Sequence, residues 1–427
     1  MPKINEVPNL VYVLALSFCS LCVFLFTGNH TAFEWTTTQD IPFILRLIDP
    51  EFLPNDFYTN SVIGSPRFVF SYIVYGITLL GVDWYTTLYL LKLLLVLCVP
   101  PLLFLATHHI FMKWHPAAAQ FKSYSTIVIM LFLCALGLFA AAFEKTIIFN
   151  RPFGWASIQL FAANTVSPMS LSFFFGLLYN IASFQYGMFR HFSPLLLLTS
   201  TLIHPVIGMC HFMFSLTFKL PIDFKKRSLV KLGVDFLIGI IGATVVLFLF
   251  KNNTVNLQAN TFIDIYVYLR HPHHYLMSSM FGWRSIFWVL FFLFPIFLSF
   301  KAKEKKYLLL SVMVFVSFMI TPIIQFLGTE VWKVKEVAII GPSRFTGYAS
   351  IFWTLNAFIV GFSIYKHDVF LGLEKLATPL RFAFYLIKKL HDNFRVVAYL
   401  FIAVSVGTFY FTHRHPLAFY EKKMLVR

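Results

Sequence analysis

A short segment near the start of the chain concentrates carboxylates in a sequence that has few of them. Asp and Glu make up 18 of 427 residues. Those between residues 28 and 66 are Glu34, Asp40, Asp49, Glu51 and Asp56. Pro50 and Pro54 break any long helix here, so Asp49, Glu51 and Asp56 are expected on turns. These three are candidate catalytic residues, with Asp56 first as a general base or metal ligand. Initiating a turn or capping a helix is the structural alternative.

A second segment combines positive charge, histidine and aromatic side chains. It begins at Arg270 and contains His271, His273, His274 and Tyr275. Arginine and histidine suit a phosphate or pyrophosphate, and the aromatic rings could stack on a sugar. His271 and His273 could also bind a metal, although their spacing matches no zinc motif. A belt of interfacial side chains is the structural alternative.

Two further polar residues are candidates for binding substrate or phosphate. His204 precedes Pro205 inside an apolar run, and a polar residue at membrane depth is costly and often functional. Its structural alternative is a hydrogen bond to a backbone carbonyl that the proline frees. Arg344 lies just outside another apolar run, where it could bind a lipid phosphate or simply extend its charge into the interface.

The composition indicates that a membrane positions these residues. Hydrophobic residues make up 59% of the chain and charged residues 12%, roughly half the charge of a soluble protein. Apolar runs of about 18 residues or more recur, which predicts an all-α, polytopic transmembrane helical bundle. The formal charge of +16 does not indicate nucleic acid, because Lys and Arg collect in short connectors between apolar runs. That distribution is typical of a cytoplasmic membrane face and favours anionic membrane lipids.

We expect about eleven spans. They cover 9–27, 67–82, 85–111, 123–143, 168–187, 192–218, 229–250, 283–300, 306–328, 346–366 and 396–412. Three connectors are strongly basic: 219–231, 301–306 and 366–395. Eleven spans with a cytoplasmic N-terminus put all three on the cytoplasmic side, as expected for a multi-pass protein of a bacterial inner membrane. The segment 366–395 is also amphipathic, which predicts a helix on the inner surface.

The same count puts the less basic connectors on the outer side. They are 28–66, 112–122, 188–191, 251–282 and 329–345. Two of them are long, the acidic loop 28–66 and the loop 251–282 that carries the histidines, and 329–345 is the third substantial one. The region 144–167 fits either a cytoplasmic loop or a re-entrant segment.

This arrangement resembles the GT-C superfamily of cell-envelope membrane glycosyltransferases, which use polyprenyl-phosphate-linked sugars. The likeness is one of topology more than of motifs. The pieces Asn55-Asp56-Phe57-Tyr58, His204-Pro205 and His271-Pro272-His273-His274 look similar to those of bacterial GT-C-like membrane proteins of uncharacterised function. The family shares a seven-helix module whose first outer loop carries a catalytic carboxylate and whose loop after helix 7 completes the donor site. The resemblance implies such a module over residues 1–282, with further transmembrane helices over 283–427.

The resemblance also implies a reaction. A sugar would pass from a polyprenyl-phosphate donor to a glycan, lipid or protein acceptor on the outer, periplasmic face. Asp56, Asp49 or Glu51 would deprotonate the acceptor hydroxyl or hold a divalent metal. Arg270, the histidines beside it and Arg344 would stabilise the departing phosphate.

Two other functions stay open. A polysaccharide polymerase or ligase of the O-antigen type also has about a dozen helices, and it relies more on Arg and His in outer loops than on carboxylates. A transporter or flippase for a lipid or small solute is the second alternative. Acids are nearly absent from the apolar runs and no internal repeat is visible, which weighs against ion-coupled transport.

Overall fold

The computed structural model describes a helical bundle. It describes residues 13–14, 17, 21, 40–56, 68–115, 166–185, 188–222, 226–253, 258–270, 276–280, 284–301, 305–342 and 349–366. All regular structure in these ranges is helical, which confirms the all-α class. Within them, three helices are long and apolar enough to cross a membrane: Trp84–Trp114, Ser228–Val246 and Lys305–Val331. These are compatible with a membrane protein, while the total of eleven spans stays a prediction.

Two short helices precede the first long one. Helix α2 (Ile41–Ile48) packs on α4 (Phe68–Thr78), with the rings of Phe43 and Tyr72 edge to face at 6.0 Å. Both helices join the main core through buried aliphatic and aromatic side chains. The 11 residues of α4 extend only about 16 Å, roughly half the thickness of the hydrocarbon core. Within the described residues, the helix expected over 67–82 therefore covers only part of a membrane.

Helix α5 (Trp84–Trp114) begins with a cap and contains two prolines. The carboxylate of Asp83 accepts a hydrogen bond from the backbone nitrogen of Thr86 at 3.0 Å, and the bonds from Thr86 lower the pKa of this carboxyl group. Pro101 lacks the N–H that would bond the carbonyl of Leu97. The hydroxyl of Ser17, in the first expected span, donates to that carbonyl at 2.9 Å. A residue of another segment thus satisfies the freed group.

The middle of the chain folds back on itself repeatedly. It comprises α8 (Pro168–Phe184), the 3₁₀ turn η3 (Met188–Phe192), α9 (Ser193–Ile203), α10 (Pro205–Lys219) and α11 (Lys226–Asn253). Gly208 of α10 packs on α9, because a Cβ added to it would lie 2.6 Å from the Thr201 nitrogen. Leu197 and Phe212 share one buried cluster farther along both helices. These contacts make α9 and α10 an antiparallel hairpin with His204 at its tip.

The single span expected over 192–218 is therefore wrong. His204 has an extended backbone, with φ −152° and ψ 101°, and Pro205 opens the next helix. A residue before proline avoids the α conformation, and proline fits the first position of a helix. The apolar run consequently holds two shorter helices that run in opposite directions.

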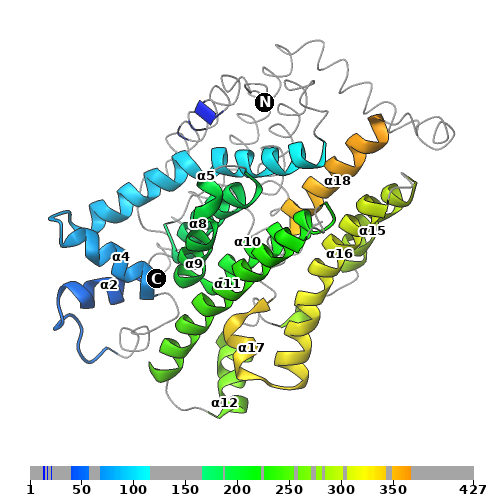
Figure 1. The fold of residues 1–427 in the computed structure, drawn as a ribbon. Coiled ribbons are helices and arrows are strands. Elements are labelled where there is room, and N and C mark those ends of the chain that lie inside the picture. Colours follow the sequence, from blue (N-terminus) through cyan, green and yellow to red (C-terminus); the bar gives the residue numbers. More distant parts are fainter. Residues whose placement is uncertain are drawn as a thin grey trace, which may run out of the picture.

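The hairpin reaches only part-way along its neighbour. A Cβ added to Gly242 of α11 would lie 3.1 Å from the Cβ of Thr201, beside the hairpin tip. Helix α11 continues from Gly242 to Asn253, about 16 Å farther, and Figure 1 shows it extending past α9 and α10. The hairpin thus has the form of a re-entrant segment whose tip lies inside the bundle.

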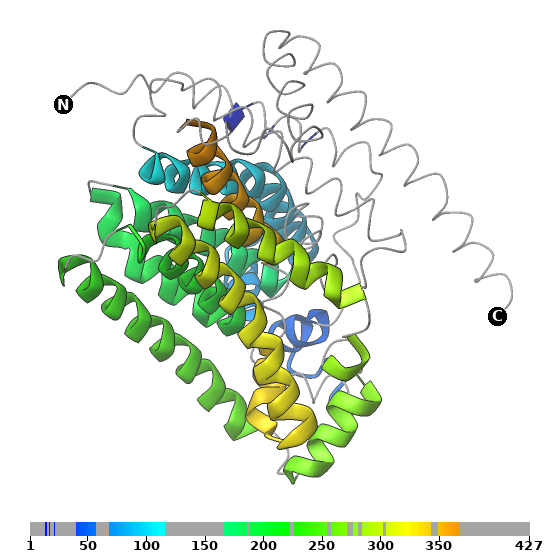
Figure 2. The ribbon, with the colours of Figure 1, turned by 90° about the vertical axis from the view of Figure 1, so that its right-hand side faces the viewer.

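The last part of the described chain adds three longer helices and several short ones. Figure 2 shows α15 (Arg284–Lys301) beside α16 (Lys305–Phe326), which ends in the π turn η5 (Leu327–Val331). Helix α18 (Ala349–Lys366) completes this group. Ser311 of α16 joins all three, since its hydroxyl lies 2.7 Å from that of Ser299 on α15 and donates to Asn356 Oδ1 of α18 at 3.2 Å. The short helices are α12 (Ala259–Ile263), the π turn η4 (Asp264–Arg270), α14 (Met277–Met280) and α17 (Lys335–Ile340).

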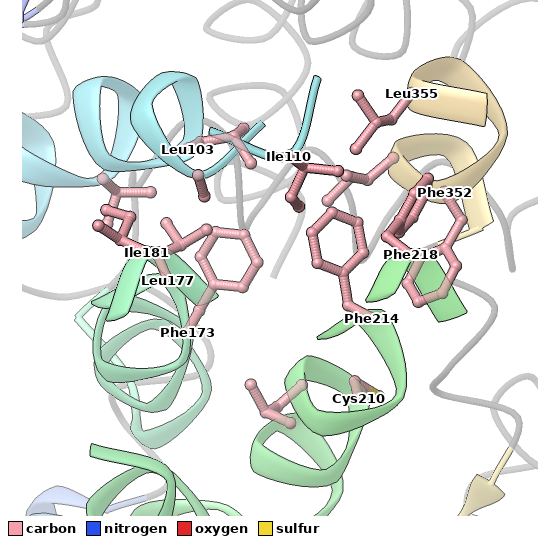
Figure 3. Packing of buried hydrophobic residues seen from close by; sticks show 14 of the residues in the cluster. Leu103, Ile110, Phe173, Leu177, Ile181, Cys210, Phe214, Phe218, Phe352 and Leu355 are labelled. Atoms are coloured by element: carbon pink, nitrogen blue, oxygen red, sulfur yellow. The ribbon is translucent and has the colours of Figure 1, made fainter. Parts of the chain in front are cut away.

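A common hydrophobic core holds these helices together. Figure 3 shows side chains of α5, α8, α10 and α18 meeting in it. Phe214 of α10 contacts Phe352 of α18 edge to face, with ring centroids 4.9 Å apart. This core contains residues on both sides of residue 282, and the module expected over 1–282 stays a prediction.

One end of the bundle gathers the ends of several helices and is rich in lysine. Trp114 Nε1 at the end of α5 donates to the Phe218 carbonyl near the end of α10 at 3.1 Å. Tyr307 at the start of α16 stacks on His115, with centroids 5.9 Å apart. Lys113, Lys219 and Lys305 lie in these helix termini, and we call this the basic end. The connector 112–122 was expected opposite 219–231, but the end of α5 lies beside the end of α10 at the basic end.

The short helices α2, α12 and α17 lie at the opposite end, which we call the far end (Figure 1). It contains the carboxylate segment and the start of the predicted phosphate-binding segment. The amphipathic segment 366–395 and the region 144–167 fall outside the described residues, except for Lys366 and residues 166–167 at their edges.

Candidate functional site

The three candidate carboxylates lie on a compact turn directly after α2. The backbone nitrogen of Asp49 ends the helix by bonding the Leu45 carbonyl at 2.8 Å. Asp49 Oδ1 then accepts from the backbone nitrogen of Glu51 at 3.0 Å, as in an Asx-turn. Asp56 N bonds the Leu53 carbonyl at 3.1 Å and closes a second turn. Asp49 therefore has the turn-forming role that the sequence raised as its structural alternative.

Arg46 fixes the shape of this turn. Its Nε donates to the Phe52 carbonyl at 2.6 Å and its Nη2 to the Leu53 carbonyl at 2.5 Å. The rigid, planar guanidinium thereby binds two consecutive carbonyls. Leu53 adopts a positive φ of 46°, which is uncommon for a leucine. The sequence analysis missed Arg46, although a basic residue in the last turn of a helix is a recognised partner for nearby carbonyls.

We call residues 49–56 the carboxylate turn. Asp49 and Glu51 are exposed and Asp56 is half-buried. The turn therefore presents acid groups to its surroundings on a backbone that Arg46 constrains. Among the described residues, no group of three or more His, Cys, Asp or Glu is placed to hold a metal ion. The divalent metal considered from the sequence stays a prediction.

The structure describes only the beginning of the Arg/His segment. Arg270 is the last residue of η4, and His271, His273, His274 and Tyr275 fall outside the described residues, as does Arg344. The part that precedes them is held in place, because Lys333 Nζ lies 3.2 Å from Asp264 Oδ1 and Lys335 Nζ lies 5.1 Å from the Phe262 ring centroid. Figure 1 draws α2 and α12 at the far end but apart from each other. A joint site formed by the two segments stays a prediction.

His204 lies at the tip of the α9–α10 hairpin and is 4% exposed. Its Nδ1 accepts from the Ile207 nitrogen at 3.4 Å, so the imidazole caps α10. Its carbonyl accepts from Gly208 N at 3.0 Å and from the Ser172 hydroxyl at 3.4 Å. From the sequence we expected a polar residue within a continuous span. In the structure His204 lies instead at the break between two helices.

Two helix N-termini meet beside His204. Helix α8 begins with Ser167, whose hydroxyl accepts from the Ser170 nitrogen at 3.2 Å. Ser172 in its first turns bonds the Ser200 carbonyl at 2.8 Å, close to the hairpin tip. Helices α8 and α10 therefore start in the same buried region and run in the same direction. Such ends carry partial positive charge and suit the anionic group of a substrate.

A buried polar network connects α8 and α10 nearer the basic end. Asn180 Nδ2 donates to the His211 carbonyl at 2.9 Å and to the Ser215 hydroxyl at 2.8 Å. Asn180 Oδ1 lies 2.5 Å from His211 Nδ1. Gly176 leaves room for the imidazole, since a Cβ there would overlap the His211 ring. The sequence analysis did not select this network, because its members are 31 to 35 residues apart.

Charged side chains lie next to this network. Tyr179 OH donates to Asp235 Oδ2 at 3.3 Å, and both residues are fully buried. Lys219 is buried and its Nζ donates to the Ser183 carbonyl at 3.3 Å. Burial, followed by the charges of three nearby cations, lowers the pKa of Lys219 from 10.5 to about 8 against the opposing effect of Asp235. In the sequence, the signal for this charged group was Asp235, an acid within an apolar run.

Comparison of the chain with family models, curated proteins and solved structures gave no match. The chain is therefore described by its own residues, as a helical protein with apolar helices long enough to cross a membrane. The likeness to the GT-C superfamily remains a resemblance, drawn from the expected topology more than from motifs.

Proposed function

We propose that this chain is a multi-pass membrane glycosyltransferase that moves a sugar from a polyprenyl-phosphate donor to an acceptor. In this proposal the far end faces the outer side of a bacterial inner membrane, with the N-terminus in the cytoplasm. The observation that carries it is the carboxylate turn, whose acid groups stand on a backbone that the Arg46 guanidinium constrains. Constrained geometry of this kind is what positioning a catalytic group requires.

Asp56 is the residue that we assign as the general base. The acceptor hydroxyl would attack the anomeric carbon, the bond to the phosphate oxygen would break, and the carboxylate would take the hydroxyl proton. Asp56 is half-buried, whereas Asp49 and Glu51 are exposed. Since Asp49 Oδ1 already accepts a backbone hydrogen bond, its main role is to shape the turn.

The departing polyprenyl phosphate requires positive charge near it. The segment Arg270–Tyr275, which starts at the far end, is our candidate for this role, together with Arg344. Around α2 and α4 the surface is apolar, as Leu80 (81% exposed), Tyr72 and Leu53 show. Exposed side chains of this kind suit contact with membrane lipid or with an isoprenoid tail.

The identity of the products tests this function. The full chain in proteoliposomes is given a panel of polyprenyl-phosphate-linked sugars with candidate acceptors. We expect release of free polyprenyl phosphate together with glycosylated acceptor, detected by mass spectrometry. Elongation of a lipid-linked glycan that survives Asp56→Asn but is lost in Arg270→Ala would favour the polymerase or ligase instead.

A transporter is the second candidate, and the α9–α10 hairpin is the observation that favours it. Broken helices whose N-termini converge inside a bundle form anion sites in transporters. Uptake of an anionic solute into proteoliposomes, without turnover of any lipid-linked sugar and with loss of uptake in Ser172→Ala, would support this candidate over the transferase.

A further inference from the structure

Four cations gather around the turn that joins α8 to η3. Lys219 donates to the carbonyl of Ser183, and Lys231 Nζ donates to the carbonyl of Arg190 at 3.1 Å. Lys113 Nζ lies 5.7 Å from the centroid of the Phe184 ring. These cations come from α5, η3, α10 and α11, and we call Lys113, Arg190, Lys219 and Lys231 the basic cluster.

Among the described residues, the positive charge of this cluster exceeds the negative charge beside it. Asp235 is the neighbouring carboxylate, and both it and Lys219 are buried. The other three cations of the cluster, Lys113, Arg190 and Lys231, are half-buried and lie nearer the surface. Like charges held close together repel, and an anion placed between them removes that repulsion. Each ammonium carries three N–H donors, so a lysine that bonds one carbonyl can also bind a phosphate oxygen.

The surface next to the basic cluster is strongly apolar. Met188 and Leu195, on η3 and α9, are 80% and 59% exposed, and Val230 of α11 is 60% exposed. Farther along α11, Val234 and Leu237 are exposed as well. A lysine-rich cluster at the end of such an apolar helix face is complementary to a lipid. The lysines would bind the phosphate and the apolar side chains would contact the hydrocarbon.

We propose that the basic cluster binds the phosphate of an anionic phospholipid, whose acyl chains lie along the exposed apolar face of η3, α9 and α11. This site lies at the basic end, away from the carboxylate turn, and does not depend on the proposed transferase activity. Charge complementarity and the exposed apolar side chains beside the cluster are the reasons for a lipid rather than a small soluble anion.

The test measures binding of short-chain phosphatidylglycerol to the purified full chain in neutral detergent. The variant carries Arg190→Gln and Lys231→Gln together, and the matched control carries Lys333→Gln and Lys335→Gln, two half-buried cations at the far end. Since one cation near an anionic lipid surface contributes about fivefold in affinity, we expect binding roughly 25-fold weaker in the variant. The control and the conservative Lys231→Arg should bind as the wild type does.

Equal phosphatidylglycerol binding by the variant and the wild type would overturn the proposal. Equally tight binding of phosphatidylcholine would also overturn it, because the site would then recognise only the hydrocarbon. Displacement of the lipid by inorganic phosphate at equal concentration would overturn it too, because the site would then bind a soluble anion. Should the double variant not fold, salt decides on the wild type. Phosphatidylglycerol binding must weaken as salt screens the cluster, and binding that is independent of salt contradicts the assignment.

Discussion

The far end and the buried middle of the bundle hold their polar groups in different ways. In the carboxylate turn Asp49 and Glu51 are exposed and Asp56 is half-buried, while Arg46 binds the backbone carbonyls. The Asn180 network is fully buried and binds side chains of neighbouring helices to one another. We infer that the carboxylate turn positions acid groups for a reaction, and that the Asn180 network maintains the packing of the broken helices. The predictions below test this distinction.

The largest effect on stability is expected at Asn180. Asn180→Leu keeps a similar volume but deprives the His211 carbonyl and the Ser215 hydroxyl of a donor, and His211 Nδ1 of its acceptor. Unmet buried polar groups cost about 1–3 kcal/mol each, so we expect a loss of about 3 kcal/mol in unfolding experiments in detergent. Thr199→Val serves as the control, because this half-buried residue bonds the Leu195 carbonyl of its own helix through an exposed hydrogen bond. It should change stability by less than about 0.5 kcal/mol. A loss at Asn180 no larger than at Thr199 would refute a structural role.

The close approach of the hairpin helices predicts the next effect. Gly208→Ala puts a Cβ within 2.7 Å of the Thr201 backbone, and overpacking of this kind costs about 1–3 kcal/mol. Gly233→Ala on α11 meets nothing within 4 Å and should leave stability unchanged or slightly raised, because alanine is the better helix former. If both variants unfold alike, α9 and α10 do not pack as a hairpin.

Arg46 should affect the carboxylate turn without much effect on the bundle. Arg46→Gln removes two charged donors to the Phe52 and Leu53 carbonyls, which in this partly exposed place we expect to cost about 1 kcal/mol. Hydrogen exchange should quicken at Phe52–Asp56 and stay unchanged in α8 and α10. Exchange that quickens throughout would mean that the turn is part of the packing and not a separate, presented element.

Lys219 predicts the smallest effect, a change of stability with pH. Its pKa is about 8 in the folded chain and near 10.5 when unfolded. Between these pH values the unfolded state binds more protons than the folded state, so the free energy of unfolding rises with pH across this window. Below pH 8 the full cost of burying the charged Lys219 lowers stability. Lys219→Met should flatten the rise in chemical unfolding experiments, with Lys333→Met as the control. If stability rises with pH at the same slope in Lys219→Met as in the wild type, other groups cause the rise.

The sequence predicted most of the helices because their composition is local information. Helices α5, α11, α16 and α18 lie where apolar runs predicted them. The prediction of one span over 192–218 was wrong because hydropathy measures only how apolar a segment is. It does not detect a reversal of chain direction, although His204-Pro205 indicated a helix break there. For the run 67–82, the described helix is Phe68–Thr78, and the span stays a prediction.

The candidate site divides in the same way. The carboxylate turn was predicted from its rare acids and prolines, and Asp49 proved to shape it. Arg46, Asn180 and Asp235 were missed, since their partners depend on which helices pack together, and a single sequence does not contain that arrangement. The role of Asp56 as a base stays a prediction.

One measurement tests that central claim most directly: turnover of a radiolabelled polyprenyl-phosphate sugar by Asp56→Asn in proteoliposomes. The matched control is Glu336→Gln, an exposed acid of α17 at the same end. Loss of a general base costs about 10²–10⁴ in rate, so we expect a fall of that size in Asp56→Asn, with the control within about twofold of the wild type. Turnover by Asp56→Asn equal to that of Glu336→Gln would contradict the assignment of the carboxylate turn as the catalytic site.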